Sequence, residues 1–91
     1  MTFKPEHCDD FIALFDHYKS HIRSAQGCTF LSMWRCKDEP NVFFTYSHWN
    51  QSEDLEAYRT SAIFAEVWPL TKRMFDAAPA AWTNEVLFEL V

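Results

Sequence analysis

Glycine is almost absent from this sequence, with one residue among 91, at position 27. Loops that cradle phosphate groups need several glycines, because a backbone without side chains can approach the phosphate closely. P-loop and dinucleotide-binding loops of the usual form are therefore excluded. Cysteine is also scarce, and the three residues contain no C-x-x-C pair, which supports neither a disulfide framework nor a zinc knuckle. Cys28 and Cys36 are expected to pack as small, buried strand residues.

A cluster of basic residues is missing as well. The formal net charge is −5, which argues against nucleic acid or an anionic membrane as a partner. No apolar run approaches the roughly 18 residues that a membrane-spanning helix needs. The opening residues MTFKPEHCDD lack the apolar core of a signal peptide. The sequence therefore predicts a cytoplasmic protein, with residues 1–91 as a single domain.

Large apolar side chains, in contrast, are abundant. Hydrophobic residues make up 48% of the chain and aromatic residues 18%. A chain of this length buries only roughly 60–65% of its unfolded surface, so this apolar content exceeds the needs of one small core. The excess predicts a homodimer, because obligate dimer interfaces resemble a divided core. It also predicts an apolar pocket.

The hydrophobic pattern changes its period along the first half of the chain. Apolar residues three and four apart predict a helix over residues 8–26, and Gly27 is expected to end it in a left-handed conformation. A period of two follows in residues 28–36 and again in residues 42–49. Because residues 37–41, KDEPN, have turn chemistry, these two segments are predicted to form a hairpin.

A capped helix is predicted to follow the hairpin. Asn50 or Ser52 is expected to accept a hydrogen bond from a free amide at its start. Thr60–Ser61 is predicted to provide the N-cap of a second, longer helix, and Pro69 is expected to kink or restart that helix. In the closing residues 82–91, WTNEVLFELV, successive side chains alternate between two faces, which predicts a last strand.

The order of elements predicts the fold class. A short first strand over residues 1–4, which an upstream extension would bring to normal length, precedes the first helix. The order strand, helix, strand, strand, helices, strand predicts an α+β fold of the ferredoxin-like, split β-α-β kind, with a four-stranded antiparallel sheet and helices on one face. Apolar residues on both faces of the segment 28–36 predict that a second copy covers the other face, which gives a dimeric α+β barrel.

Three histidines are candidates for chemistry. His17 and His21 lie four residues apart on the first helix, a spacing that can place two imidazoles on one metal. His17 falls toward solvent and His21 on the flank of the apolar stripe, and no acidic or cysteine ligand stands at a fixed short spacing. A solvated face is therefore the favoured alternative, and no metal site is predicted. His48 is a candidate general base because an unperturbed imidazole titrates near neutral pH. Alternatively, it lies at an interface.

Aromatic residues are the strongest remaining signal. Several of them are expected to line the space between the sheet and the helices, and four tryptophans are difficult to pack flush in so small a domain. The alternative is that they only pack together. The candidates are Trp34, Tyr46, Trp49, Tyr58, Phe64, Trp68 and Phe75.

An ordered set of residues resembles the antibiotic biosynthesis monooxygenase domain family. The segments are HIRSAQGCTFLSM, the EPN turn and FFTYSHWNQSEDLEAYRTSAIF. The positions that match the family spacing are Gly27, Cys28, Tyr46, Trp49, Ser52, Leu55, Ser61 and Phe64. The resemblance covers about residues 11–75 and implies a ferredoxin-like fold in a dimeric α+β barrel.

The resemblance also implies an activity. Similar proteins include small cofactor-independent oxygenases that oxidise aromatic or quinol substrates with molecular oxygen, and others that degrade haem. This sequence has Tyr58 where the family usually has a histidine, so haem degradation is disfavoured and no cofactor is expected. Ser47 stands where the family often has a glutamate, and the truncated first strand lacks the asparagine of several active members.

Two functions remain open from the sequence. The first is a cofactor-free monooxygenase whose partners are an aromatic small molecule and molecular oxygen. In that case Tyr58, His48 and Arg59 are the predicted catalytic residues. The predicted substrate-binding residues are Trp49, Trp34, Tyr46, Phe64 and Trp68. The second is a non-catalytic, dimeric small-molecule-binding or stress-associated domain that keeps the fold without oxygenase activity.

Overall fold

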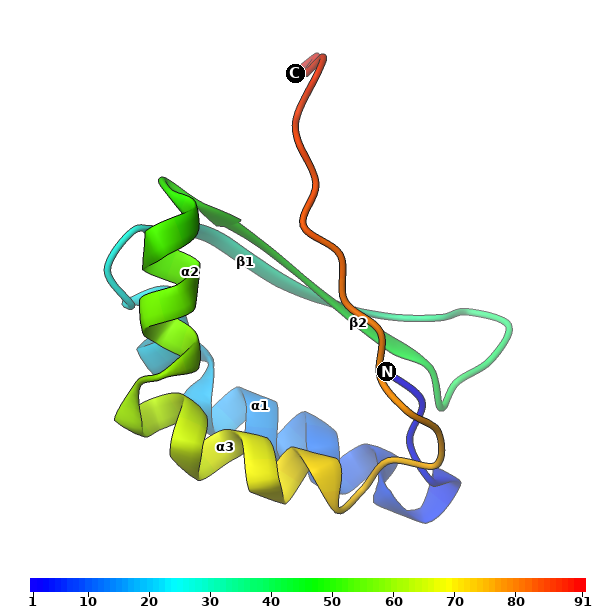
Figure 1. The fold of residues 1–91 in the computed structure, drawn as a ribbon. Helices are drawn as coiled ribbons and strands as arrows, with labels where there is room; N and C mark the ends of the chain where they lie inside the picture. Colours follow the sequence, from blue (N-terminus) through cyan, green and yellow to red (C-terminus); the bar gives the residue numbers. More distant parts are fainter.

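The computed structural model describes residues 1–91 as a two-stranded hairpin packed over helices (Figure 1). The elements in chain order are η1 (Pro5–His7), α1 (Cys8–Arg23), β1 (Cys28–Arg35), β2 (Phe43–Trp49), α2 (Ser52–Arg59) and α3 (Ala62–Lys72). Helices α1 and α3 lie side by side below the hairpin, and α2 stands at one end of it. This arrangement confirms the predicted α+β class. None of the helices combines the length and apolar character that a membrane span requires.

Helix α1 forms where the three-and-four spacing predicted it. Phe11 and Ile22 are buried on its inner side, and Asp9 and Asp10 stand in its first turn, where carboxylates favour the helix dipole. Gly27 follows with a φ angle of 82°, which confirms its predicted left-handed conformation. The glycine therefore turns the chain from α1 into β1.

The hairpin places different side chains on its two faces. Phe30 lies opposite His48, and Trp34 lies opposite Phe44. Because directly opposed residues in an antiparallel pair share a face, these residues form the outer face of the sheet. The intervening positions, such as Phe43, point toward the helices.

The predicted four-stranded sheet is not present. Residues 1–4 pair only through two isolated bridges, Thr2 with Val42 and Phe3 with Phe75. The predicted last strand, residues 82–91, forms no strand and runs away from the body of the molecule (Figure 1). The pairing with the first residues of the chain stops at Asp76, whose amide donates to the Thr2 carbonyl over 2.8 Å.

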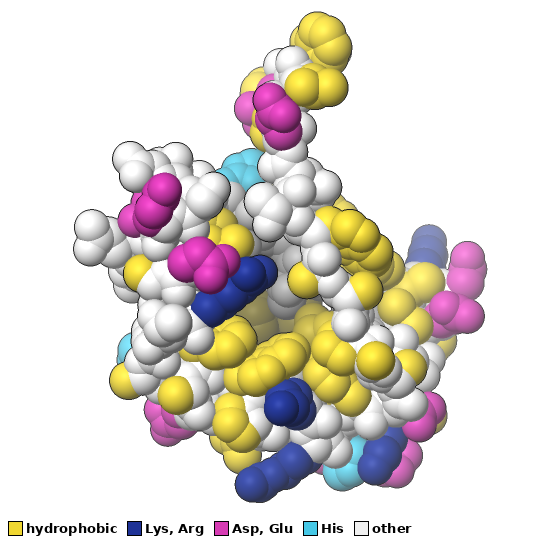
Figure 2. Space-filling view, in the orientation of Figure 1, with side chains coloured by type: hydrophobic (Ala, Val, Ile, Leu, Met, Phe, Trp, Pro, Cys, Tyr) yellow, Lys and Arg dark blue, Asp and Glu magenta, His cyan; other side chains and the backbone are white.

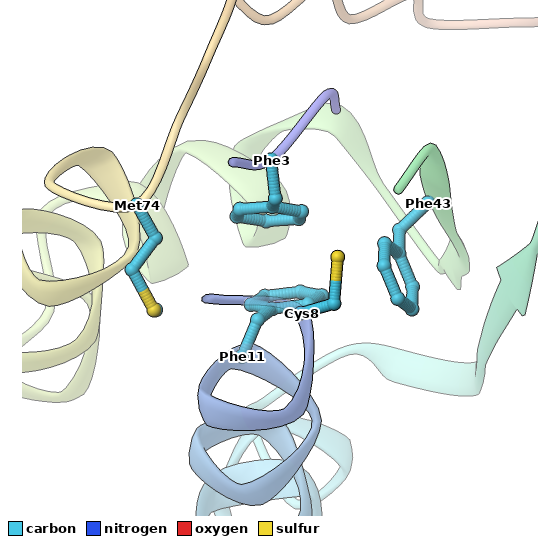
Figure 3. Packing of buried hydrophobic residues seen from close by; sticks show 5 residues of the cluster. All are labelled: Phe3, Cys8, Phe11, Phe43 and Met74. Carbon is cyan, nitrogen blue, oxygen red and sulfur yellow. The ribbon is translucent and has the colours of Figure 1, made fainter. Parts of the chain in front are cut away.

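The core lies where α1, the hairpin and the first residues of the chain meet (Figure 3). Its members are Phe3, Cys8, Phe11, Phe43 and Met74. The Phe3 ring stacks on Phe11 with 4.1 Å between centroids and meets Phe43 edge-on at 5.6 Å. Phe3 is 0% exposed, so the short first segment anchors the core although it forms no strand.

The two later helices begin differently. The predicted cap of α2 by Asn50 or Ser52 is wrong, because Gln51 occupies the cap position and its side chain forms no capping hydrogen bond. The predicted cap of α3 is confirmed, since the Phe64 amide donates to the Ser61 Oγ atom over 3.3 Å. Pro69 lies inside α3, which continues to Lys72.

Candidate functional site

A row of aromatic rings lines the helix side of the hairpin. Trp49 at the end of β2 lies 5.4 Å from Tyr58 of α2, measured between ring centroids. Tyr58 meets Phe64 edge-on at 5.4 Å, and Phe64 stacks on Trp68 at 5.5 Å. Four of the predicted site residues, from three different elements, are therefore in successive contact. We call Trp49, Tyr58, Phe64 and Trp68 the aromatic row.

The aromatic row continues into the core. Trp68 contacts Phe75 at 5.7 Å, and Phe75 contacts the fully buried Phe3 at 5.1 Å. Offset and edge-on ring pairs of this kind each add about 0.5–1.5 kcal/mol beyond the area that they bury. The row is thus fixed at its core end, which holds its ring faces in place.

The molecule is hollowed between the sheet and α3. Figure 2 shows this hollow in the same orientation as Figure 1, with hydrophobic side chains gathered along its lower wall and basic side chains at its border. The elements around it, β2, α2 and α3, are those that carry the aromatic row. An apolar wall with a few polar groups is the usual character of a small-molecule site.

Tyr58 is the titratable member of the aromatic row. Burial raises the pKa of its phenol above the ordinary value, and the nearby Cys28 thiol raises this pKa further. Tyr58 also borders a cavity of about 260 Å³ between α1 and α2, together with His21, Asp54 and Ser61. The phenol therefore stays protonated at neutral pH, and its hydroxyl is suited to donate a hydrogen bond to an anion.

Gly27 and Asp54 fit closely at one end of this cavity. A Cβ atom on Gly27 would collide with the side chain of Asp54. The only glycine of the chain thus serves two purposes, a left-handed turn and the close approach of α2. This approach sets the position of α2, and with it Tyr58, against the end of α1.

The indole N–H of Trp49 is already engaged. It donates to the Ser47 Oγ atom over 2.9 Å, within the same strand. Trp49 therefore offers a ring face rather than a hydrogen-bond donor. Ser47, at the position where the resemblance implies a glutamate, takes the role of orienting this ring.

The remaining predicted residues of the strands form a second cluster on the outer face of the sheet. Tyr46 lies 5.7 Å from Trp34 and 4.9 Å from His48, and Phe30 lies 4.9 Å from His48. The Nε2 atom of His48 is buried there without a hydrogen-bond partner. We call Phe30, Trp34, Tyr46 and His48 the outer-face cluster. The structure therefore divides the predicted site into two sets on opposite faces of the sheet.

Arg59 and the first-helix histidines lie at the surface. The Arg59 guanidinium donates to the Glu56 carboxylate over 3.0 Å, and its side chain is 44% exposed. His17 and His21 are exposed, and the ring of Tyr18 contacts both. No group of three or more potential metal ligands is found in the chain.

The sequence reasoning missed the polar residues that border the cavity beside Tyr58. Asp54 and Tyr58 are four residues apart, so their shared helix face was available as a signal. His21 was considered only as a metal ligand. Its place beside α2 depends on how α1 packs, which no local pattern reports.

The model of the family described as antibiotic biosynthesis monooxygenase matches residues 1–68. The chain belongs to the antibiotic biosynthesis monooxygenase family. None of the curated proteins compared with the chain matches it. The family resemblance predicted from the sequence is therefore confirmed.

Solved structures agree with this antibiotic biosynthesis monooxygenase assignment at the level of the fold. A candidate antibiotic biosynthesis monooxygenase from Bordetella bronchiseptica is 22% identical, with a TM-score of 0.82 over 96% of this chain and 91% of that one. A conserved protein from Methanosarcina mazei Go1 is 21% identical, with a TM-score of 0.80 over 85% and 76%. A candidate family member from Deinococcus radiodurans is 15% identical, with a TM-score of 0.73 over 92% of each chain.

Proposed function

We propose that this chain is a cofactor-independent monooxygenase that acts on an aromatic or quinol-like small molecule. The observation that carries the proposal is the aromatic row, which runs from Trp49 through Tyr58 and Phe64 to Trp68 along elements that surround the hollow. Family membership supports the same reading. The proposal treats residues 1–91 as one domain.

In the proposed reaction the substrate supplies all the electrons. An anthrone-type substrate loses its acidic proton, and the resulting electron-rich anion reduces molecular oxygen. One oxygen atom forms a new carbon–oxygen bond and becomes a carbonyl, while the two methylene hydrogens leave with the second oxygen atom as water. The protein's task is to favour the anion and to hold it in a site from which water is excluded.

Tyr58 is the proposed hydrogen-bond donor to the substrate oxyanion. Its raised pKa keeps the phenol protonated, so it donates rather than accepts. Arg59 follows it in α2, but its guanidinium is paired with Glu56 at the surface, so it takes no part in the proposed step. The ring faces of Trp49, Phe64 and Trp68 provide the apolar wall against which a flat substrate stacks.

The outer-face cluster has a different proposed role. Trp34 is 55% exposed, Phe30 43% and Tyr46 38% in the isolated chain. Contiguous exposed aromatic surface of this kind marks an interaction site. We propose that a second copy covers this face and that the two sheets form a dimeric α+β barrel, in which His48 lies at the interface rather than beside the substrate.

A specific observation favours a second candidate function. The Trp49 N–H is satisfied by Ser47, and the rings of the aromatic row contact one another. Both features suit a non-catalytic, dimeric small-molecule-binding or stress-associated domain. Such a domain would bind flat aromatic molecules against the same aromatic row without catalysing their oxidation.

Oxygen consumption distinguishes the two functions. Purified protein is supplied with a panel of hydroquinones and anthrones, and oxygen uptake is measured beside the spontaneous oxidation of each substrate. Tyr58→Phe is expected to lower kcat/KM by about 10²-fold or more, the typical cost of removing an oxyanion donor. Tyr18→Phe is the matched control, because the Tyr18 hydroxyl bonds Glu66 on another part of the surface. Binding of these compounds without protein-dependent uptake would favour the binding domain.

A further inference from the structure

The aromatic row bends between its second and third rings. The rings of Trp49 and Tyr58 are inclined by only 31°, and those of Phe64 and Trp68 by only 17°. Between these pairs, the rings of Tyr58 and Phe64 meet edge-on at 79°. The row therefore consists of two nearly flat sections that stand roughly perpendicular to each other. We call Trp49 with Tyr58 the first section and Phe64 with Trp68 the second section.

Hydrogen bonds of the backbone hold this bend. It falls where α2 ends and α3 begins, because Tyr58 belongs to α2 and Phe64 to α3. The Ser61 amide donates to the Tyr58 carbonyl over 3.0 Å, and the Phe64 amide donates to the Ser61 Oγ atom over 3.3 Å. Ser61 thus links the two residues whose rings form the corner, so the turn between the helices keeps the two sections in this arrangement.

Both sections keep accessible surface. All four side chains of the aromatic row are half-buried, so none is fully enclosed in the core. They belong to elements that surround the hollow, and the lower wall of this hollow is hydrophobic in Figure 2. A ligand in the hollow can therefore contact the rings of both sections when its own shape follows the bend.

A hydrogen-bond donor belongs to the bend as well. The Tyr58 ring forms one side of the corner, and burial raises the pKa of its phenol, which keeps the hydroxyl protonated. The Trp49 N–H, in contrast, already donates to Ser47. A ketone or oxyanion at the bend of a ligand is therefore the group that suits Tyr58.

We propose that this site prefers substrates whose two aromatic rings are joined at an angle through a ketone, of the benzyl aryl ketone class, over flat fused ring systems. The inference deepens the proposed function and rests on it, because it names the substrate of the same site. One ring stacks on each section, and the ketone between the rings lies beside Tyr58. A fused tricyclic ketone such as anthrone stays flat, so it covers one section and leaves the other without a stacking partner.

The bent ketone carries the same reacting unit as anthrone, a methylene group acidified by a ketone and an aromatic ring. Its anion reduces molecular oxygen as in the proposed reaction. The methylene carbon forms a bond to one oxygen atom and becomes a carbonyl, while its two hydrogens leave with the second oxygen atom as water. The product is a 1,2-diketone, and the substrate supplies all the electrons.

Deoxybenzoin and anthrone are a matched pair of ligands for the test. They have the same number of carbon atoms and a single ketone, and they differ in whether their rings are fused. The Kd of each for the full chain is measured by calorimetric titration without oxygen. Deoxybenzoin is expected to bind at least about threefold more tightly, the effect of one additional ring contact. Equal affinity, or tighter binding of anthrone, would overturn the inference.

Phe64→Leu tests whether the preference arises at the bend. It removes the ring that begins the second section but keeps the backbone amide that bonds Ser61. The Kd of deoxybenzoin is expected to rise about threefold or more, and that of anthrone to change little. Phe44→Leu is the matched control, because Phe44 is 48% exposed and lies opposite Trp34 on the outer face. A preference that persists in Phe64→Leu, or that is lost equally in Phe44→Leu, would show that the bend does not select the ligand.

Oxygen uptake separates this inference from the proposed function. Protein-dependent conversion of deoxybenzoin to benzil, its 1,2-diketone, would support both. Preferential binding of deoxybenzoin with no uptake from any substrate would refute the oxygenase and support the shape preference as a property of the binding domain. Uptake with anthrone and no preferential binding of deoxybenzoin would support the oxygenase and overturn the inference.

Discussion

The ring of Trp49 lies 5.4 Å from the ring of Tyr58, with 31° between the ring planes. This contact joins the end of the hairpin to the last turn of α2, nine positions further along the chain. Trp49 is itself held by its hydrogen bond to Ser47. The position of the Tyr58 phenol therefore depends on a strand residue, although the phenol belongs to a helix.

The phenol of Tyr58 is expected to ionise above the ordinary tyrosine pKa of about 10, because burial disfavours its anion. The unfolded chain then releases this proton first as the pH rises. The folded state gains stability from this group below pH of about 10 and loses it above that value. Urea unfolding between neutral and alkaline pH should show a smaller alkaline loss in Tyr58→Phe than in the native chain.

Tyr18 provides the comparison for this titration. Its pKa is also raised, first by its hydrogen bond to Glu66. Absorbance titration of the native chain and of the single variants Tyr58→Phe and Tyr18→Phe separates the two phenols. One titration step should disappear in Tyr58→Phe. If that step has the ordinary tyrosine pKa, the buried position of Tyr58 is contradicted.

Gly27→Ala is expected to destabilise the fold by more than the backbone cost alone. A left-handed residue with a side chain costs about 1–2 kcal/mol, and the added Cβ also meets Asp54. In an Asp54→Gly background the whole colliding side chain, its Cβ atom included, is removed, so the same substitution should cost only the backbone part. Urea unfolding of the four chains in this cycle measures the difference. Equal costs in both backgrounds would show that Asp54 does not lie against Gly27.

Phe3→Ala is expected to destabilise the fold by about 3–5 kcal/mol, the usual cost of truncating a buried phenylalanine. Phe3 is 0% exposed and contacts three other aromatic rings. Phe3→Leu provides a milder version if the alanine variant does not fold. Leu70→Ala, at an exposed position of α3, should cost less than about 1 kcal/mol. Similar losses in the Phe3 and Leu70 variants would argue against the placement of the core.

Ser61→Ala is expected to cost about 1 kcal/mol, because Ser61 caps α3 by accepting from the Phe64 amide. Ser52→Ala provides a matched control, since Ser52 starts α2 without acting as its cap. Chemical denaturation should therefore separate the two serines. A larger loss at Ser52 would indicate that α2 is capped as the sequence first predicted.

The local features of the fold were predictable from the sequence. Helix α1, the left-handed Gly27 and the hairpin all follow from patterns within about 20 neighbouring residues, where side-chain period and turn chemistry act directly. The extended course of residues 82–91 was not predictable in this way. Alternation in residues 82–91 indicates a capacity to form a strand, but a strand also needs a partner edge within reach, and these residues pair with no strand of the chain.

The candidate site was predicted only in part. The contact between Trp49 and Tyr58 follows from a strand that leads into a helix, and the family spacing indicated both residues. His48 was assigned to the same reaction as Trp49 and Tyr58, although the period of two predicts that His48 and Trp49 lie on opposite faces of the sheet. The neighbours of Tyr58 across the cavity depend on the packing of α1 against α2, which is not encoded locally.

The continuity of the aromatic row with the core has a consequence for how such a protein can diverge. Near Phe75 and Phe3, each ring supports both the fold and its neighbour in the row, so replacements there threaten folding before they alter recognition. Near Trp49, the row ends at the edge of the hairpin, with fewer rings depending on it. New ligand preferences should therefore arise first by substitution at the Trp49 end, while the Phe3 end stays aromatic in any descendant that still folds.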